Sequence, residues 1–280
     1  MSIEDMFSIN DSIFVTENSN GAANSGIIIT DKGVILVDST FFPSKARRIT
    51  QFVSSITTKV ILYVINTHYH LDHTLGNCAI DAPVVGSTLT KKYLESFDLK
   101  AFKQTLEPLI QKELKDAKLI PPSMVFKNKL TFDLGNKKIE IVRMGGHTPD
   151  SSVVYVWPEG ICFCGDLVFA GYHAEIEEDS DLSKWISSLK KIKEKNPKWI
   201  VPGHGEVGGI EEIDDMILYL EKFKSLSKLL KLKRTKEVVD KFGEDPVFAN
   251  RGFALLFEES LANYLKRRGK NGKNVGADKT

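Results

Sequence analysis

Histidines are scarce in this chain, and half of them fall inside one short segment. Of the six histidines among 280 residues, three lie in the stretch Thr-His-Tyr-His-Leu-Asp-His that begins at residue 67. This stretch directly follows residues 59–66, which are apolar almost throughout and predict an interior strand covered on both faces. The carboxyl end of a buried strand is where α/β proteins tend to place their sites. The segment therefore predicts an α/β fold with a functional site at that sheet edge.

The spacing within this segment suits metal coordination. In extended backbone, residues two apart point to the same side, so His68 and His70 can bind one ion while Tyr69 faces away. Where the chain turns into a helix, Asp72 and His73 are carried to a second position close by. Imidazole nitrogens and carboxylate oxygens suit zinc, with bonds of about 2 Å. The alternative is a surface loop that happens to be rich in histidine, and this spacing after a buried strand disfavours it.

Three further candidate ligands each lie in a glycine-containing loop after an expected strand. They are His147 in Gly-Gly-His-Thr-Pro, Asp166 in Cys-Gly-Asp-Leu and His204 in Pro-Gly-His-Gly. Glycine lets the backbone approach a crowded site closely. Five of the six histidines thus fall in one predicted metal site.

The pattern along the chain predicts two strand-rich halves, each with helices. Strands are expected in the first half over 12–17, 26–30, 34–38, 59–66 and 82–86, with a helix over 44–56 that Ser44 caps. Strands are expected in the second half over 124–126, 129–134, 138–143, 153–157, 160–164 and 199–201, with a helix over 182–195. Two mixed sheets packed face to face, with helices outside, would bury these elements.

Two helical regions have no place in a minimal version of this arrangement. Residues 90–119 are charged and helical in character, with a break near Pro108, and form an expected insertion. Residues 211–268 also follow a helical pattern. The chain is therefore divided into a main domain over 1–210, a helical C-terminal extension over 211–268 and a flexible tail over 269–280.

Composition limits the partners and the compartment. The formal net charge is +1, from 38 basic and 37 acidic residues, so no global field attracts nucleic acid. No apolar stretch reaches the roughly 18 residues that a membrane span needs. The N-terminus lacks the pattern of a signal peptide, and three cysteines fit a reducing compartment. We therefore expect a cytoplasmic protein that acts on a small molecule, with neither nucleic acid nor a membrane as partner.

The ordered set of candidate ligands resembles the metallo-β-lactamase superfamily. The resemblance rests on His-x-His-x-Asp-His at 68–73, on His147, Asp166 and His204 after it, and on an early Asp38 that follows an apolar strand. It runs from about Ile13 to Gly205. It implies an αββα sandwich of the α/β class, with the metal site at the edge between the two sheets. The helical insertion and the C-terminal extension are additions to that fold.

The resemblance also implies a role for each candidate ligand. It assigns His68, His70 and His147 to a first metal, Asp72, His73 and His204 to a second, and Asp166 to both. Two carboxylates leave two divalent ions net positive, which favours a hydroxide between them, and metal-bound water titrates near pH 7. Zinc is the expected metal, with iron or manganese as alternatives. Asp72 is also a candidate catalytic residue, because it can handle the proton.

The implied enzyme is a hydrolase whose bridging hydroxide attacks a small-molecule substrate. Esters, lactams, thioesters and phosphoesters are the expected substrates, with broad specificity and β-lactamase-like activity. A persulfide dioxygenase-like redox enzyme with a single iron is the main alternative. A non-catalytic metal-binding module is a weaker alternative, because a lost ligand would be its signature and the full set is present.

A few residues outside the ligand set are candidates for supporting roles. Asp38 is expected to hydrogen bond to a ligand, and capping a turn is its alternative role. Tyr172 and His173 lie in a loop after Asp166 and are candidates for contacting substrate, with a mere surface role equally open. Three phenylalanines of the extension are expected to pack in its core rather than face the pocket: Phe248, Phe253 and Phe257. The extension itself is open to a role as a lid or as a homodimer contact.

Overall fold

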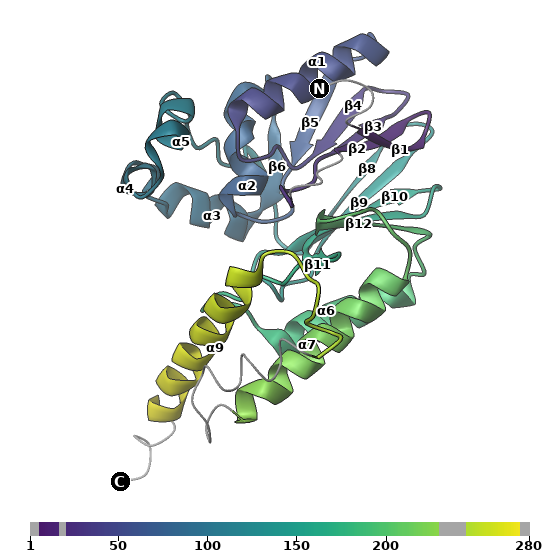
Figure 1. The fold of residues 1–280 in the computed structure, drawn as a ribbon. Coiled ribbons are helices and arrows are strands. Elements are labelled where there is room, and N and C mark those ends of the chain that lie inside the picture. The colour runs from purple at the N-terminus through teal and green to yellow at the C-terminus, as the bar shows by residue number, and fades with distance from the viewer. Residues whose placement is uncertain (1–5, 17–20, 230–244, 275–280) are drawn as a thin grey trace.

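Two β-sheets face one another between layers of helices in the computed structural model, which describes residues 6–16, 21–229 and 245–274 (Figure 1). The first sheet has seven strands in the order β1-β2-β3-β4-β5-β6-β7. These strands are β1 (Met6–Asn10), β2 (Ile13–Thr16), β3 (Gly26–Ile29), β4 (Val34–Val37), β5 (Ile61–Ile65), β6 (Val84–Ser87) and β7 (Met124–Phe126). Neighbours from β1 to β4 are antiparallel and neighbours from β4 to β7 are parallel, so the sheet is mixed.

The second sheet has five strands in the order β12-β11-β10-β9-β8. These strands are β8 (Lys129–Asp133), β9 (Lys138–Arg143), β10 (Ser152–Trp157), β11 (Ile161–Phe169) and β12 (Trp199–His204). Only the pair β11 and β12 is parallel among these neighbours. The predicted arrangement of two mixed sheets with helices outside is confirmed. Strand β1 was not among the predicted elements, because its sequence Met-Phe-Ser-Ile-Asn lacks a clear alternation.

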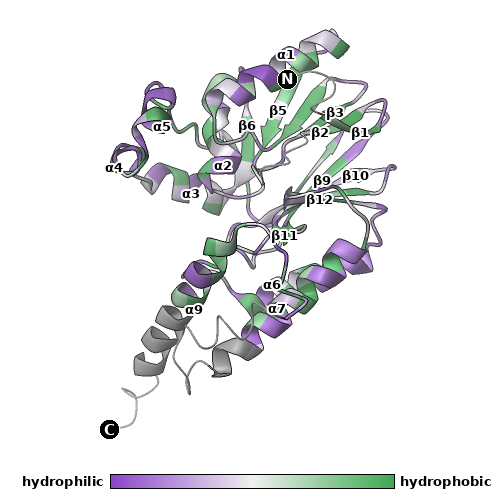
Figure 2. Ribbon diagram, in the orientation of Figure 1, coloured by the Kyte–Doolittle hydropathy of each residue, from purple (hydrophilic) through white to green (hydrophobic). Residues whose placement is uncertain are grey.

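Strand β4 shows how the core is divided between the layers. Alternate side chains of a strand point to opposite faces of its sheet. Ile35 and Val37 belong to the apolar cluster between the two sheets, which also contains Val154 of β10. Val34 and Leu36 belong instead to the cluster beneath helix α1 (Pro43–Ile56). A strand buried on both faces is apolar at every position, and Figure 2 shows the neighbouring β3 and β5 as mainly hydrophobic.

Helix α1 begins one residue earlier than the sequence pattern predicts. Its N-cap position is Phe42, and Pro43 occupies the first turn, where its fixed φ suits a helix and no N–H is needed. Ser44 is therefore inside the helix, and the prediction that it is the cap is wrong. Its Oγ instead donates a hydrogen bond to Oε1 of Glu113 at 2.5 Å, which ties α1 to helix α5 (Pro108–Glu113).

The second sheet is covered by helices α6 (Leu182–Glu194) and α7 (Glu211–Leu229) (Figure 1). The Asp181 carboxylate caps α6 by accepting hydrogen bonds from the backbone N–H groups of Ser183 and Lys184, both at 3.0 Å. Trp185 is completely buried and its indole N–H donates to the carbonyl of Leu167 in β11 at 2.9 Å. This side chain therefore locks α6 onto the strand that carries the candidate ligand Asp166.

The insertion and the extension are largely helical where the structure describes them, with non-helical chain at 114–119 and 245–253. Residues 88–113 form α3 (Thr88–Ser96), α4 (Leu99–Gln104) and α5, with Pro108 at the start of α5. Helix α9 (Ala254–Asn274) reaches into the range 269–280, where a flexible tail was expected. Residues 230–244 and 275–280 lie outside the described part. Within the described ranges, no helix is both long and apolar enough to cross a membrane.

Removing the Trp185 side chain should destabilise the fold strongly. The Trp185→Ala variant is expected to lose about 3–5 kcal/mol of unfolding free energy, because it leaves a cavity and an unpaired carbonyl. Trp199 is 36% exposed, so Trp199→Ala is the matched control and should cost about 1 kcal/mol or less. Urea unfolding followed by circular dichroism measures both, and similar losses for the two variants would contradict this role of Trp185.

Candidate metal centre

The histidine-rich segment leaves the first sheet at the end of β5 and turns into a short helix. His68 and His70 lie in the chain between β5 and α2 (Leu71–Thr74), which bends at residues 67–69, and their ring centroids are 4.7 Å apart. Asp72 and His73 are carried on α2 itself, whose chain continues into the 3₁₀ helix η2 (Leu75–Ala79). The first pair of candidate ligands thus precedes α2 and the second pair lies within it, and the chain before α2 is bent where extended backbone was expected.

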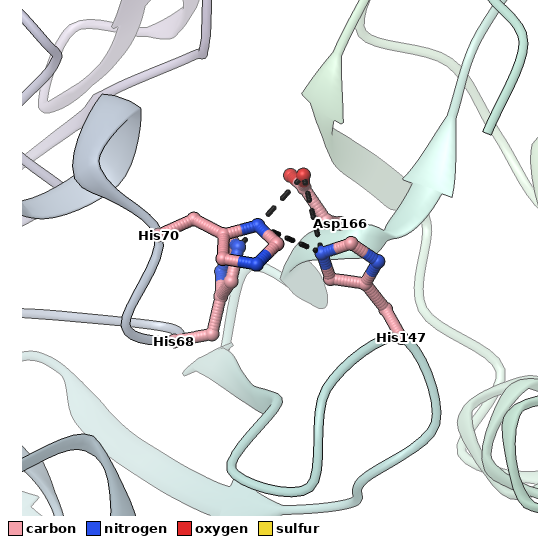
Figure 3. Close-up of side chains that lie close together, drawn as sticks. All are labelled: His68, His70, His147 and Asp166. Atoms are coloured by element: carbon pink, nitrogen blue, oxygen red, sulfur yellow. Dashed lines mark hydrogen bonds and ion pairs between the residues drawn. The ribbon is translucent and has the colours of Figure 1, made fainter. Parts of the chain in front are cut away.

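The remaining candidate ligands come from the second sheet. His147 lies in the loop between β9 and β10, Asp166 lies within β11, and His204 ends β12. Because β11 and β12 are parallel neighbours, Asp166 and His204 approach the same edge. Figure 3 shows His68 and His70 facing His147 and Asp166 across a small central space.

The side chains form two groups. Within each group, the potential ligand atoms all lie within 4.8 Å of one another. The first group is His68, His70, His147 and Asp166, and the second is Asp72, His73 and His204. Asp166 also reaches the second group. Its Oδ1 lies 2.9 Å from Nε2 of His73, and its Oδ2 lies 3.3 Å from Nε2 of His204. One carboxylate therefore contacts imidazoles of both groups.

Backbone carbonyls orient two of the imidazoles. Nδ1 of His147 donates to the carbonyl of Glu175 at 3.0 Å, and Nδ1 of His204 donates to the carbonyl of Gly21 at 2.8 Å. A carbonyl oxygen only accepts, so the proton of each neutral ring is on Nδ1. The Nε2 lone pairs are then left facing the cluster, which is the tautomer that a metal requires.

Asp38 performs the same task for His73. Its Oδ2 accepts a hydrogen bond from Nδ1 of His73 at 2.8 Å, and Oδ1 accepts from the backbone N–H of Thr67 at 2.8 Å. The Thr67 hydroxyl also donates to Oδ2 at 2.8 Å. Asp38 is 3% exposed and has a φ of 58°, a left-handed conformation that aspartate tolerates better than most residues. The geometry matches the expected hydrogen bond from Asp38 to a candidate ligand.

The donor set fits a bound cation. Nε2 of His68, Nε2 of His73 and Oδ1 of Asp166 are buried and have no hydrogen-bond partner in the described part of the chain. Leaving buried polar atoms unpaired is costly, and each of these three atoms faces another group of the cluster. Metal ions held by the two groups would satisfy all three atoms. Nitrogen and carboxylate donors in this number are the ligands that divalent transition metals prefer.

Comparison with known proteins identifies the family. The family model described as the metallo-beta-lactamase superfamily matches residues 19–204. The chain belongs to this superfamily. It is a hydrolase of that superfamily, with a site of histidines and aspartates that can bind metal.

Curated relatives from distant organisms share this match at low identity. A type 2 metallo-beta-lactamase of Bacteroides fragilis is 27% identical over 199 residues, which are 69% of this chain and 72% of that protein. A probable metallo-hydrolase of Methanocaldococcus jannaschii is 28% identical over 201 residues, which are 68% of this chain and 92% of that protein. At this identity the substrate does not follow from the relatives.

Solved structures agree on the fold. A metallo-beta-lactamase from Pontibacter korlensis superimposes with a TM-score of 0.62 at 22% identity, covering 77% of this chain and 98% of that one. A sec-alkylsulfatase from Pseudomonas sp. gives a TM-score of 0.74 at 15% identity, covering 98% of this chain and 52% of that one. The metallo-β-lactamase fold expected from the motifs is therefore confirmed.

The electrostatics of this superfamily site favour positive charge in the second group. Burial alone would lower the pKa of His204, but Asp166 and Asp72 raise it to about 10. Burial would likewise raise the pKa of Asp72, but His73 and His204 lower it to about 2. His147 lies where burial and the neighbouring His70 dominate, and its pKa falls to about 4. Ionised carboxylates and a neutral imidazole are the forms that ligate a cation.

Glu175 is a site residue that the motifs did not reveal. Its Oε2 lies 3.4 Å from Nδ1 of His70, and its own backbone carbonyl orients His147. Burial would lower the pKa of His70, but the Glu175 carboxylate raises it to about 9. Glu175 lies in irregular chain after β11, and the only signal in the sequence is the acidic stretch Glu-Ile-Glu-Glu-Asp that it begins.

Asp150 is a second residue that the motifs did not reveal. It is completely buried, and its Oδ1 and Oδ2 accept hydrogen bonds from the hydroxyls of Thr148 at 2.7 Å and Thr90 at 2.8 Å. Thr90 belongs to α3, so Asp150 links the helical insertion to the loop that carries His147. Burial raises the pKa of Asp150 to about 6, against an ordinary value of 3.8.

The two candidates for substrate contact are placed in different surroundings. His173 is only 5% exposed, and its Nδ1 lies 3.1 Å from the hydroxyl of Tyr219 in α7. Its ring packs on Phe257 of the extension, so neither a surface position nor a place among the clustered ligands is observed. Tyr172 is half-buried, and its ring lies 4.6 Å from that of Phe253.

The three phenylalanines of the extension also differ. Phe248 and Phe257 are buried in the cluster beneath the second sheet, as expected for core residues. Phe253 instead lies with its ring 5.9 Å from His204, so this residue reaches the site. Its φ of 61° is strained for a bulky side chain and has no signature in the sequence. The extension therefore contributes one ring to the edge of the metal centre.

Replacing Asp38 should weaken metal binding without removing a ligand. Asp38→Asn keeps the size and can still accept from Thr67, but it no longer presents a charged acceptor to His73. We expect zinc affinity to fall by about 10- to 100-fold, measured by competition with a chromophoric chelator. Asp133→Asn, at the exposed end of β8, is the control and should leave the affinity unchanged. Equal affinities for the Asp38 variant and the parent protein would refute the orienting role.

The buried Asp150 should make stability depend on pH. Its folded pKa is raised above the unfolded value, so the protonated form is favoured by folding. The resulting stability is present below roughly pH 4 and is lost as pH rises through about 6, by at most about 3 kcal/mol. Asp150→Asn removes this loss, so its stability relative to the parent should improve between about pH 4.5 and pH 7.5.

Urea unfolding at the two pH values, in the same metal-free buffer, measures this difference. Asp116→Asn is the control, because the Asp116 side chain is 89% exposed, and its stability relative to the parent should change little with pH. A difference for Asp150→Asn that is independent of pH would show that the buried carboxyl does not titrate as expected.

Proposed function

We propose that this superfamily member holds two divalent metal ions, zinc in the first instance, and hydrolyses small esters, lactams, thioesters or phosphoesters. The observation that carries the proposal is the position of Asp166. Its carboxylate is 1% exposed and contacts His68 and His147 of one group and His73 and His204 of the other. A buried carboxylate shared in this way supports two ions held side by side rather than one.

The other side chains would divide between the two ions. His68, His70 and His147 would hold the first, and Asp72, His73 and His204 the second. Three imidazoles at one position and two with a carboxylate at the other suit zinc, with iron and manganese as the alternatives. When bound, the pair of ions supplies an activated water near neutral pH and polarises the electrophilic centre of the substrate.

Asp72 differs from Asp166 in its access to solvent. The side chain of Asp72 is 36% exposed, whereas that of Asp166 is 1% exposed. Oδ2 of Asp72 lies 3.3 Å from Nε2 of His204, so one edge of the carboxylate faces the second group. The exposed part of the group can meet a proton that is released during hydrolysis. We therefore propose Asp72 as ligand and as proton carrier, and Asp166 as ligand alone.

The relatives support the reaction class more than any one substrate. Those named above include lactamases, a probable metallo-hydrolase and an alkylsulfatase, whose substrates differ in the bond that is cleaved. The same set of ligand types can serve all of them, because the metal pair activates water irrespective of the leaving group. We accordingly propose broad specificity, with β-lactamase-like hydrolysis among the activities.

Metal content decides between the proposed centre and a redox centre. Protein purified without chelator or added metal should contain approximately two zinc ions per chain by plasma mass spectrometry. It should hydrolyse at least one member of a panel of thioester, lactam, lactone and phosphodiester substrates. Substituting Asp166 by Asn should reduce both metal content and hydrolysis, the latter by at least about tenfold. A single iron with little zinc would overturn the proposal and favour sulfur oxidation by a persulfide dioxygenase-like enzyme.

A further inference from the structure

A pocket of about 360 Å³ opens beside the candidate metal centre. His70 and Asp72 form its wall toward the predicted ions, so a substrate bound in the pocket would present its reacting group to them. Because the pocket shares these two residues with the metal centre, its lining bears on substrate choice. The inference below rests on the proposed hydrolytic function.

One side of the pocket is aromatic. Phe41, from the chain between β4 and α1, lies with its ring 6.4 Å from that of Phe102 in α4. Phe97, from the end of α3, lies 5.7 Å from the same Phe102. Tyr69 completes the wall and packs against Tyr93 of α3 with ring centroids 4.6 Å apart. The helical insertion therefore supplies much of an apolar surface that suits an alkyl or aryl group.

The pocket lining also includes acidic residues. Glu175 and Glu177 line the pocket, and the lining residues in the described part of the chain include no lysine or arginine. The Glu175 carboxylate faces His70, but the Glu177 carboxylate has no ion-pair partner among the described residues. Burial, and then the neighbouring Glu175, raise the pKa of Glu177. Two partly buried carboxylates close together favour a positive charge between them.

We infer that this pocket selects substrates that combine an apolar group with a positive charge, such as an alkylammonium ester, and disfavours anionic ones. The aromatic wall would hold the apolar part, and its ring faces attract an onium group as well. Glu175 and Glu177 would provide the charge complement. Anionic thioesters, phosphomonoesters and lactams that carry a carboxylate would meet these carboxylates and be poor substrates, so the inference narrows the specificity proposed above.

Glu175 and Glu177 differ in how directly they act on the candidate metal centre. Glu175 lies beside His70, so its charge also acts on the metal centre, and its removal affects every substrate. Glu177 lines the pocket and interacts with His70 through its charge, but, unlike Glu175, it forms no ion pair with His70 among the described residues. The selectivity of a Glu177 variant is therefore the more direct readout.

The test compares two esters that differ only in charge. Hexanoylcholine carries a quaternary ammonium, and 3,3-dimethylbutyl hexanoate is its neutral isostere with the same acyl group. For the zinc-loaded protein we expect kcat/KM for the cationic ester to exceed that for the neutral ester by roughly tenfold. This is the ratio expected from one ion pair, partly screened by solvent, between the ammonium group and the pocket carboxylates. Glu177→Gln should reduce this preference about fivefold, because it removes one of the two pocket carboxylates that attract the ammonium group.

Glu178→Gln is the matched control, because Glu178 is the exposed neighbour of Glu177 and does not line the pocket. Its preference should equal that of the parent protein. Glu175→Gln should reduce the preference and also change hydrolysis of the neutral ester. Circular dichroism spectra establish that all three variants fold.

A binding measurement separates this inference from the proposed hydrolysis. Isothermal titration calorimetry should detect hexyltrimethylammonium but not hexanesulfonate, and Glu177→Gln should weaken the binding about fivefold. If neither these esters nor any member of the thioester, lactam, lactone and phosphodiester panel is hydrolysed but the cation binds in this way, the pocket assignment stands and the proposed function fails. If both esters are hydrolysed equally and the cation binds no better than the sulfonate, the function stands and the inference is overturned.

Discussion

One buried carboxylate places the strongest demand on this structure. Asp166 is 2% exposed in the middle of β11, and burial of a lone charge there would cost several kcal/mol. The fold compensates this charge by placing imidazoles from three separate segments of the chain around the Asp166 carboxylate. The close approach needs glycine, since a Cβ on Gly203 would lie 1.9 Å from Oδ1 of Asp166. The order of the strands, the glycine at position 203 and the positions of the histidines are thus all constrained by the Asp166 side chain.

The groups that orient the imidazoles come from still more distant parts of the chain. The carbonyl of Gly21 holds His204, the carbonyl of Glu175 holds His147, and Asp38 holds His73. Each of these hydrogen bonds joins residues that lie 28 or more positions apart, and the one between Gly21 and His204 also joins the halves of the chain that form the two sheets. The metal centre is therefore a consequence of the completed tertiary structure. A local unfolding of either sheet edge would disorder the tautomers before it removed any ligand.

This dependence explains what the sequence could and could not predict. The segment 68–73 could be identified because four candidate ligands lie within six residues of one another in the sequence. Loops with glycine beside His147 and His204 are also local features. Glu175 and Asp150 act through contacts with His70 and Thr90, 105 and 60 residues away, and no local pattern marks them. The failed cap at Ser44 has the same cause, since its partner Glu113 belongs to another helix.

The residues proposed to catalyse the reaction and those proposed to select the substrate lie in different parts of the molecule. The candidate ligands stand at strand ends and beside them, where two packed sheets allow little movement. The pocket next to them is made by Phe41, the insertion helices and the irregular chain that carries Glu175 and Glu177. Such connecting segments tolerate change without loss of the core. Superfamily members can therefore share one way of activating water and still differ in substrate, and the charge of the pocket wall is one place where this chain would differ.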